Sequence, residues 1–482
     1  MKRKLGWFGL GFAGAELAAA ILPPLVCVPA AAFLVCLALL WIKRRRDSAI
    51  PVLGALCGLA WFLVFTLVWV RPVKALAGQT VTCTAVVETD ADASYSESRL
   101  RGTLRLTEID GRAANVKVQC ASFPGESAGE RFTAKFALTE LPDNKYRLSR
   151  HSKGVYLQAE YLGSYHPLDA SLAPRFALYR LRQRWSATLH RWLPRQLDGI
   201  EAAMLLADKS RLDDSVQQAF RTAGVSHLLA VSGLHTGIVF VLINAVLWWL
   251  PLLRRGHLLK NLLAAGAVWL FVAAAGFPPS AVRAAVMCTV LQAALASASE
   301  YVGMNALATA AFGMLLWNPN WLGDISFQLS FLAVAGILAW GVPLCRRCRT
   351  RWKGLNVVID AYLIGLAATL ATAPLVSHTF GVVPLAGLAV NPPAIALAGV
   401  VVFGGALWML APVGVLAPAF GFVTGTAAGG IDALARLTAS LPGGAANYTL
   451  GGWQTAALYF VFVLATAAVW SAEPKKSVPL RT

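Results

Sequence analysis

The sequence predicts a polytopic α-helical membrane protein, with about 12 membrane segments, that carries one small extracytoplasmic all-β (OB-like) domain. Hydrophobic residues make up 57% of its 482 positions, and the mean hydropathy is +0.60. This composition is far too apolar for a soluble chain of this length. Apolar runs of about 20 residues, enough to cross a bilayer, recur along the chain, and one non-membrane domain at about 76–165 interrupts them.

The formal net charge of +18 does not by itself indicate nucleic-acid binding. The basic residues gather in clusters that flank apolar runs, and such charges set the orientation of membrane helices. These clusters lie at residues 2–4, 43–46, 254–260, 346–353 and 475–481. If the N-terminus is cytoplasmic, all of them fall on the cytoplasmic side. We therefore expect a multi-pass protein of the cell inner (cytoplasmic) membrane, with cytoplasmic termini and the β-domain outside.

Three membrane helices are expected before the β-domain, within residues 1–75. They lie at about 5–22, 25–42 and 50–70. The other segments belong to a membrane domain at 225–472, followed by a cytoplasmic tail at 473–482. These segments are expected at about 226–253, 259–276, 280–298, 302–317, 322–342, 355–378, 388–411, 413–431 and 453–471.

Residues 76–165 predict a small extracytoplasmic β-barrel. Strand-like alternation occurs at 80–88, 100–108, 115–121, 131–137 and 154–162, with Asp110–Gly111 as a hairpin signal. About five strands favour a barrel of the oligonucleotide-binding (OB) type. The domain holds eleven Lys/Arg and eleven Asp/Glu, so a structural or partner-binding role fits as well as DNA binding.

Two of the eight cysteines, Cys83 and Cys120, fall in this domain. An extracytoplasmic compartment permits disulfides, so this pair is either a disulfide or two free thiols. Cys345 and Cys348 form a lone C-x-x-C motif without a second pair, which does not predict a zinc site. We predict no metal site and no cofactor.

Residues 166–224 predict amphipathic surface helices. The first, at about 171–195, has apolar residues at helical spacing and no acidic residue, which is typical of a basic helix lying along the membrane surface. Its arginines contact either lipid headgroups or the phosphates of a polyanion such as DNA. The arginines concerned are Arg175, Arg180, Arg182, Arg184 and Arg191.

The stretch 226–240 opens an apolar run yet carries His227, Ser232 and His235. Polar groups at membrane depth are costly unless they pair or face a water-filled cavity. Ser232 and His235, one helical turn apart, either act as nucleophile and base or simply satisfy each other or a water on a polar face. On one continuous helix, His227 and His235 are about 12 Å apart along the axis, too far to share a metal.

Other polar residues lie near helix ends. Arg283 either reaches the outer surface or projects a fixed positive charge into a pore. Asp324 is either a helix N-cap or, with Gln328 one turn on, part of a polar lining. His378 and Asn391 lie near the outer ends of flanking helices. The Asn391-Pro392-Pro393 run predicts a broken helix near a cavity.

Four blocks of this sequence resemble the ComEC family of competence proteins. They are G-V-S-H-L-L-A-V-S-G-L-H-T-G (224–237), preceded by D-K-S-R-L-D-D-S-V-Q-Q-A-F-R-T-A, then P-P-S-A-V-R-A-A-V-M (278–287), N-P-N-W-L-G-D-I-S-F-Q-L-S-F-L-A-V-A-G (318–336) and H-T-F-G-V-V-P-L…N-P-P (378–393). The N-terminal helices and the external β-domain also match the layout of this family.

The resemblance implies an inner-membrane channel that carries one strand of incoming DNA into the cytoplasm during natural transformation. It implies no enzymatic activity and no catalytic residue. Many members carry a C-terminal metallo-β-lactamase-like domain; no H-x-H-x-D-H run occurs here, so we expect a short form without it. The residues expected on the DNA path are His227, Ser232, His235, Arg283, Asp324, Gln328, His378 and Asn391.

The expected partners are single-stranded DNA, membrane lipid, an extracytoplasmic DNA receptor, and a cytoplasmic motor or single-strand-binding protein. A separate motor is expected because the sequence has no P-loop motif. Without the resemblance, a secondary transporter or flippase for a small or lipid-linked solute fits equally well. A third alternative is an intramembrane hydrolase that uses Ser232 and His235.

Overall fold

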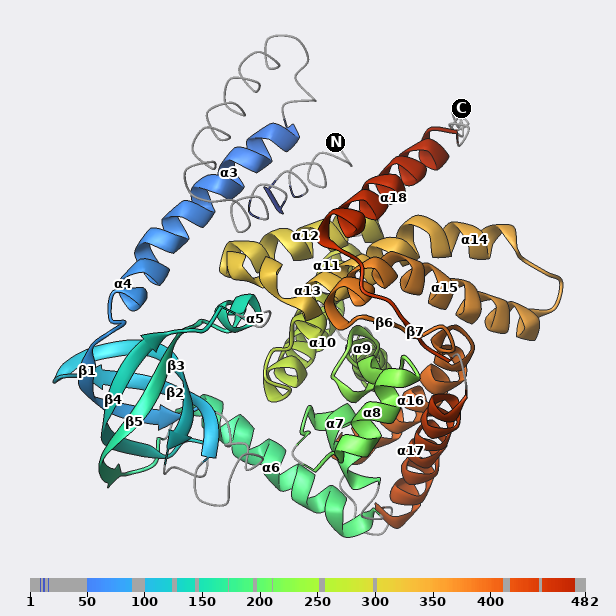
Figure 1. The fold of residues 1–482 in the computed structure, drawn as a ribbon. Coiled ribbons are helices and arrows are strands. Elements are labelled where there is room, and N and C mark those ends of the chain that lie inside the picture. Colours follow the sequence, from blue (N-terminus) through green and yellow to red (C-terminus); the bar gives the residue numbers. More distant parts are fainter. Residues whose placement is uncertain are drawn as a thin grey trace. The chain divides into compact units, whose positions relative to one another are not determined.

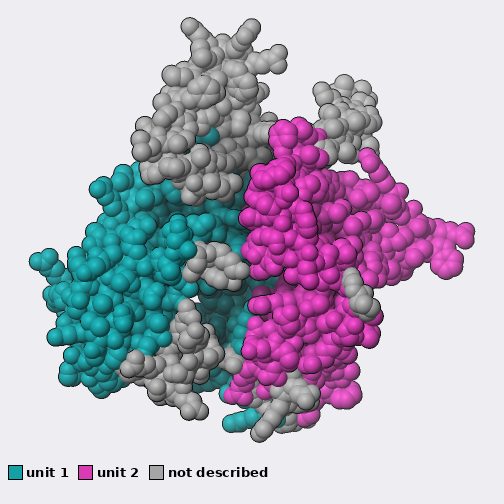
Figure 2. Space-filling view, in the orientation of Figure 1, with its two compact units in different colours: residues 1–192, 206–210, 231–328 teal, residues 193–205, 211–230, 329–482 magenta. Residues whose placement is uncertain are grey.

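The computed structural model forms two units (Figure 2). Unit 1 comprises Met1–Trp192, Leu206–Ser210 and Val231–Gln328, and unit 2 comprises Leu193–Leu205, Arg211–Ala230 and Leu329–Thr482. The residues that the structure describes are 9, 12–13, 16, 50–88, 100–123, 128–143, 147–171, 173–193, 197–209, 211–250, 256–297, 301–410, 417–441 and 444–472.

Unit 1 contains a closed five-stranded β-barrel with the strand order β1-β2-β3-β5-β4 (Figure 1). Every neighbouring pair is antiparallel except β3 and β5, which run parallel. The strands are β1 (Thr80–Val87), β2 (Leu100–Ile109), β3 (Arg112–Phe123), β4 (Arg131–Glu140) and β5 (Val155–Leu168). All five predicted strands are confirmed, as is the turn at Asp110 (φ 48°) and Gly111 (φ 78°).

The structure of the barrel core shows whether Cys83 and Cys120 form a disulfide. Cys83 and Cys120 are both free, buried thiols, and burial raises their pKa values to about 12 and about 11. Cys83 pairs with Ile109 on β2, whereas Cys120 pairs with Gly102. On the order of 20 Å of strand separates these two positions, while a disulfide needs Cα atoms within about 7 Å. Of the two alternatives that the sequence leaves open, the structure therefore shows two free thiols and not a disulfide.

The helices of unit 1 precede and follow the barrel. A helix formed by α3 (Ile50–Phe65), η2 (Thr66–Val70) and α4 (Arg71–Lys74) leads into it, and α5 (Arg147–Ser152) lies between β4 and β5. The others are α6 (Pro174–Trp192), α9 (Gly233–Val246), α10 (Gly256–Ala274), α11 (Pro279–Ala296), α12 (Gly303–Trp317) and η5 (Pro319–Gly323). α13 (Ile325–Gly336) starts after η5, and its residues from Leu329 onward belong to unit 2.

Unit 2 is almost entirely helical. Among its described residues, one two-stranded pairing, β6 (Val382–Val383) with β7 (Ala446–Asn447), joins two loops. The helices are α7 (Asp198–Leu206), α8 (Asp214–Thr222), η3 (Ser226–Leu229), η6 (Ile337–Gly341), α14 (Val342–Arg347), α15 (Lys353–Phe380), α16 (Gly387–Leu410), α17 (Ala417–Ser440) and α18 (Gly452–Ala472).

Six helices in the described residues are long and apolar enough to cross a membrane. They are Leu53–Lys74, Gly256–Ala274, Pro279–Ala296, Ile325–Arg347, Lys353–Phe380 and Gly387–Trp408, and three shorter apolar helices are Gly233–Val246, Gly303–Trp317 and Gly452–Leu464. The segments predicted at 5–22 and 25–42 lie almost entirely outside the described residues. The segment predicted at 413–431 continues in α17 to Ser440, includes the Asp432–Arg436 ion pair, and is not among the six.

The prediction of a broken helix at Asn391-Pro392-Pro393 is wrong, because α16 continues through both prolines. A proline cannot donate to the carbonyl four residues earlier, so Pro392 and Pro393 leave two carbonyls of the first turn without their helical partners. The Tyr362 hydroxyl of α15 donates to one of these carbonyls, that of Ala389, at 3.5 Å. Such side-chain replacement lets an apolar helix tolerate proline.

Unit 2 also buries a carboxyl group in α7. Glu201 is 1% exposed, and burial raises its pKa from 4.5 to about 7. A carboxyl whose pKa is raised on folding stabilises the protein below its unfolded pKa, and this stability is lost as the pH rises through the folded pKa. We therefore expect the free energy of unfolding to fall by roughly 3 kcal/mol between about pH 4.5 and pH 7.

Thermal unfolding of the protein in detergent micelles at pH 5 and pH 8 measures this effect. Glu201→Gln is expected to flatten the pH dependence, whereas Asp213→Asn at an exposed helix start keeps it. An unchanged slope in the glutamine variant would show that Glu201 is not the responsible group.

Candidate functional site

The stretch 226–253 does not form the single helix that the sequence predicts. It begins with η3, continues in extended backbone, and enters α9 only at Gly233. Ser232 is the N-cap, with φ −114° and ψ 176°. Its hydroxyl accepts the Leu234 N–H at 3.2 Å, while His235 Nδ1 accepts the Ser232 N–H at 3.3 Å. This reciprocal capping box satisfies backbone donors at the helix start and places the break there.

The Ser232 and His235 side chains also contact each other, with 2.8 Å between Oγ and Nδ1. His235 is fully buried. Thr236, also buried, donates both its N–H and its hydroxyl to the Ser232 carbonyl at 3.2 Å. The contacts of this pair are thus those of a helix cap.

The spacing argument against a metal shared by His227 and His235 assumed one continuous helix. It no longer applies, because the helix begins at Gly233. The described residues nevertheless contain no group that could hold a metal ion.

The start of α11 packs against this cap. Ser280 Oγ donates to the Val231 carbonyl at 2.9 Å. A Cβ atom added to Gly233 would lie 2.7 Å from Arg283 Nη2, so the guanidinium lies directly against the glycine backbone. Arg283 is 6% exposed. Two motif blocks about 50 residues apart therefore form one cluster, the α9–α11 site: Ser232, Gly233, His235, Ser280 and Arg283.

The electrostatics of the α9–α11 site favour an anion. A helix N-terminus carries a partial positive charge, and its first N–H groups attract negative groups. The Arg283 guanidinium adds a full positive charge beside it, with only a small part of its surface exposed. Water screens such a charge weakly, so it acts over a longer distance than a surface arginine.

Asp324 has a different environment. It is 4% exposed, and its Oδ2 accepts hydrogen bonds from Ser149 Oγ at 3.0 Å and Ser152 Oγ at 3.1 Å. Its Oδ1 accepts the Phe327 N–H at 3.1 Å, which caps α13. The predicted N-cap is confirmed, and the two serines of α5 are partners that the sequence did not indicate. A role on the DNA path stays a prediction.

Further contacts join the same segments. Asn318 Nδ2 donates to the Ser152 carbonyl at 2.8 Å, and Asn320 Nδ2 donates to Tyr156 Oη at 2.9 Å. We call this cluster the α5 latch; its members are Ser149, Ser152, Tyr156, Asn318, Asn320 and Asp324. Burial raises the Tyr156 pKa to about 12, so its phenol is neutral. The polar N-P-N run before Asp324 was the one sequence signal for this cluster.

The remaining predicted residues of unit 1 lie near these clusters or on α6. Gln328 Nε2 donates to the Leu322 carbonyl and so secures the turn before α13. On α6, Arg180, Arg184 and Arg191 are exposed. The Arg182 guanidinium lies 4.6 Å from the Tyr179 ring centroid. The side chain of Arg175 lies outside the described residues.

The buried side of α6 faces its own unit. Phe176 packs against Val86 and Ala128 of the barrel region, and Ser186 Oγ donates to Asp208 Oδ2 at 2.8 Å. The predicted amphipathic helix is therefore present, with one face packed and an arginine-bearing face exposed.

In unit 2, His227 is exposed on η3, and His378 lies at the end of α15. His378 Nδ1 is 2.8 Å from the Leu450 carbonyl, and the neighbouring Ser377 Oγ donates to the Tyr448 carbonyl and accepts the Leu450 N–H. These bonds tie the loop before α18 to the end of α15. Nothing in the sequence indicates that these loop residues are partners of His378 and Ser377.

Asn391 lies in the second turn of α16. Its side-chain oxygen is buried and, among the described residues, has no hydrogen-bond partner. Gly387, one turn earlier, lies against the Ala223 carbonyl, and a Cβ on Gly224 (φ 76°) would lie 2.8 Å from the Pro384 ring. The first and last motif blocks therefore meet here, because glycine at 224 permits both the left-handed backbone and the close approach.

These observations define a class: a multi-pass α-helical membrane protein that carries a small β-barrel, with a buried cation at a capped helix start. The family model described as competence protein matches residues 204–473, more than half of the chain. The chain therefore belongs to the competence protein family, which confirms the ComEC resemblance of its motifs. The match includes every residue of the α9–α11 site, whereas the β-barrel precedes it.

Two relatives are similar over part of their length. ComE operon protein 3 of Bacillus subtilis (strain 168) is 29% identical over 206 residues, which cover 43% of this chain and 25% of that protein. An uncharacterized protein of Aquifex aeolicus (strain VF5) is 31% identical over 195 residues, covering 40% of this chain and 43% of that protein. The match thus spans less than half of either relative. No solved structure matches the chain.

Proposed function

We propose that this chain forms a channel in the cell inner membrane that passes single-stranded DNA into the cytoplasm during natural transformation. The observation that carries the proposal is the buried Arg283 guanidinium against the capped start of α9. Membership of the competence protein family supports the proposal.

The proposed role of each residue follows from electrostatics. A DNA strand brings one negative charge per nucleotide into the membrane, and a fixed positive charge with nearby N–H groups lowers this barrier. Arg283 supplies the charge, and Gly233 leaves the space it needs. Ser232 and His235 are positioning residues, because their capping box fixes the helix start.

We also propose a type and a location for the barrel, a membrane topology and domain boundaries. The barrel, with its strand order β1-β2-β3-β5-β4, is of the OB type and extracytoplasmic. The chain crosses the membrane about 12 times with both termini in the cytoplasm. The domain boundaries at 1–75, 76–165, 166–224, 225–472 and 473–482 belong to this proposal, with His227, Gln328, His378 and Asn391 as further path residues.

The proposal also assigns partners to the chain, including those of its exposed arginines. The exposed arginines of α6 contact lipid headgroups or the phosphates of the strand. An extracytoplasmic receptor delivers the DNA, and a cytoplasmic motor or single-strand-binding protein takes up the strand. The chain itself acts as a channel without enzymatic activity.

The hydrolase alternative rests on one observation, the 2.8 Å contact between Ser232 Oγ and His235 Nδ1. A serine hydrolase loses its activity when the nucleophile is removed. A channel whose Ser232 serves as a helix cap loses about 1 kcal/mol of helix stability in Ser232→Ala. We therefore expect this variant to keep strand entry within about tenfold of wild type.

Uptake of end-labelled duplex DNA by the source cell tests the proposal. Surface-bound label and cytoplasmic single strands are scored separately in wild-type, deletion and His235→Ala cells. We expect the deletion to keep surface binding and to remove internal label, and His235→Ala to lower internal label more than Ser232→Ala does. Unchanged internal label in the deletion would favour a transporter, which saturates with a small solute instead.

A further inference from the structure

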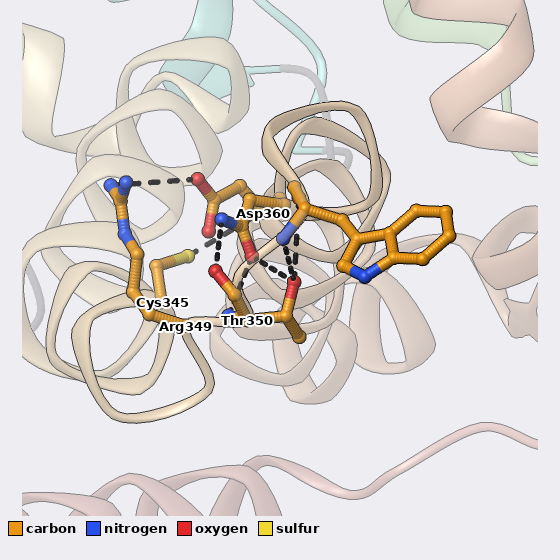
Figure 3. Close-up of polar contacts among 6 residues, drawn as sticks. Cys345, Arg349, Thr350 and Asp360 are labelled. Carbon is orange, nitrogen blue, oxygen red and sulfur yellow. Dashed lines mark hydrogen bonds and ion pairs between the residues drawn. The ribbon is translucent and has the colours of Figure 1, made fainter.

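The basic loop, residues 346–353, joins α14 to α15 in unit 2 and is held in one shape by the first turn of α15 (Figure 3). Asn356 Oδ1 accepts both the N–H and the hydroxyl of Thr350 at 2.8 Å, and Asn356 Nδ2 donates to the Thr350 carbonyl at 2.9 Å. The Trp352 N–H in turn donates to Thr350 Oγ1 at 3.3 Å. One asparagine side chain thus fixes the turn that precedes Trp352.

A second contact holds the loop from the next turns of α15. Arg349 Nη2 lies 3.9 Å from Asp360 Oδ2, and Figure 3 shows the two side chains facing each other. The Arg349 side chain is still 64% exposed, so this pair leaves most of its surface available. The loop is therefore preorganised by α15 while its basic side chains remain exposed.

The loop presents one aromatic ring among positive charges. Trp352 is 63% exposed, and the Arg351 guanidinium lies 5.8 Å from its ring centroid. The stretch contains no acidic residue. Its basic residues, all exposed, are Arg346, Arg347, Arg349, Arg351 and Lys353.

The neighbouring helices indicate what lies against this surface. The loop connects two helices that are long and apolar enough to cross a membrane, Ile325–Arg347 and Lys353–Phe380. The first turns of α15 expose Leu355 (49%), Val357 (70%) and Val358 (51%) directly beside the basic residues. Apolar side chains next to a Trp ring and arginines match the layers of a bilayer, from acyl chains to headgroups.

We propose that the basic loop is a binding site for the headgroups of anionic phospholipids. Their phosphates accept hydrogen bonds from the arginines, their net negative charge complements the loop, and the Trp352 ring occupies the boundary between headgroup and acyl chain. A nucleic-acid strand offers the same phosphates, but it supplies no acyl chains to cover Leu355, Val357 and Val358. The proposal is independent of the proposed channel function.

Quenching of Trp352 by brominated lipids tests the site in the full-length protein. The protein is reconstituted in nanodiscs of phosphatidylcholine and phosphatidylglycerol, with bromine on the acyl chains of one lipid or the other. The chain has sixteen tryptophans, so the Trp352 signal is the difference between wild type and Trp352→Phe. At equal mole fraction, we expect brominated phosphatidylglycerol to quench this signal at least about twofold more than brominated phosphatidylcholine.

The double variant Arg346→Gln/Arg351→Gln is expected to lose this preference, whereas the matched control Arg112→Gln/Arg221→Gln, at exposed positions elsewhere, keeps it. Equal quenching by both lipids overturns the headgroup site, and no quenching by either places the loop away from the bilayer. If single-stranded oligonucleotide quenches the Trp352 signal and phosphatidylglycerol does not, the ligand is a strand instead.

Discussion

Exchanging Arg283 for glutamate is expected to lower strand entry by at least about a hundredfold, the largest functional effect that the proposed channel predicts. Two unit charges 4 Å apart interact by about 4 kcal/mol at an effective dielectric constant of 20. Arg283 is 6% exposed and lies against the start of α9. A carboxylate there replaces attraction of the phosphates by repulsion.

Graded variants separate charge from shape. Arg283→Lys keeps the charge without the planar guanidinium and is expected to retain most strand entry, whereas Arg283→Gln loses at least about tenfold. Arg112→Glu, at an exposed position in the barrel, is the matched control for a change of net charge. Membrane content of each variant is measured alongside uptake. Wild-type entry in a folded Arg283→Glu protein would remove Arg283 from the DNA path.

The second large effect is expected at the α5 latch, where Asp324→Ala lowers the free energy of unfolding by about 3 kcal/mol or more. The alanine removes an N-cap, worth about 1 kcal/mol, and two hydrogen bonds to a charged acceptor, worth about 1.5–3 kcal/mol each. It leaves Ser149 and Ser152 without this acceptor. Thermal unfolding measures the loss, and Ser149→Ala is expected to show a smaller one.

A disulfide cross-link tests whether Asp324 holds α5 against η5. A Cβ atom on Gly323 would lie 2.7 Å from Leu148 Cβ, so Leu148→Cys/Gly323→Cys places two thiols within reach of a disulfide after a small shift. We expect fast oxidation of this pair in an otherwise wild-type chain and slower oxidation with Asp324→Ala. Asp432→Ala, which removes only a pair with the exposed Arg436 on one helix, is the control. Equal oxidation rates in all three proteins would refute the latch.

Local pattern predicted most of the elements of this fold. Alternation with a period of two located every barrel strand, and Asp110–Gly111 located their hairpin turn, because side-chain periodicity and turn chemistry act over a few residues. The long apolar runs located the six described helices that are long and apolar enough to cross a membrane. The ComEC resemblance rested on four short blocks, and the family match confirms it.

Local pattern failed where a residue has more than one compatible environment. Ser232 and His235 fit the polar face of a continuous helix as well as a capping box. Only the structure shows the extended backbone at Ser232 and the helix start at Gly233, against which Arg283 and Ser280 pack. Pro392 and Pro393 indicate a broken helix by themselves. The Tyr362 hydroxyl from another helix removes part of their cost.

By itself, the sequence determined the membrane class of this protein, its barrel strands and its family, because these depend on hydrophobicity and spacing along the chain. Only the tertiary structure decided which polar groups meet. Asp324 bonds to serines 172 and 175 residues earlier, and Cys83 and Cys120 are kept apart by the register of β1 and β3 along β2. Such contacts depend on how distant segments pack. The sequence around a buried polar group does not show which distant residue will be its hydrogen-bond partner.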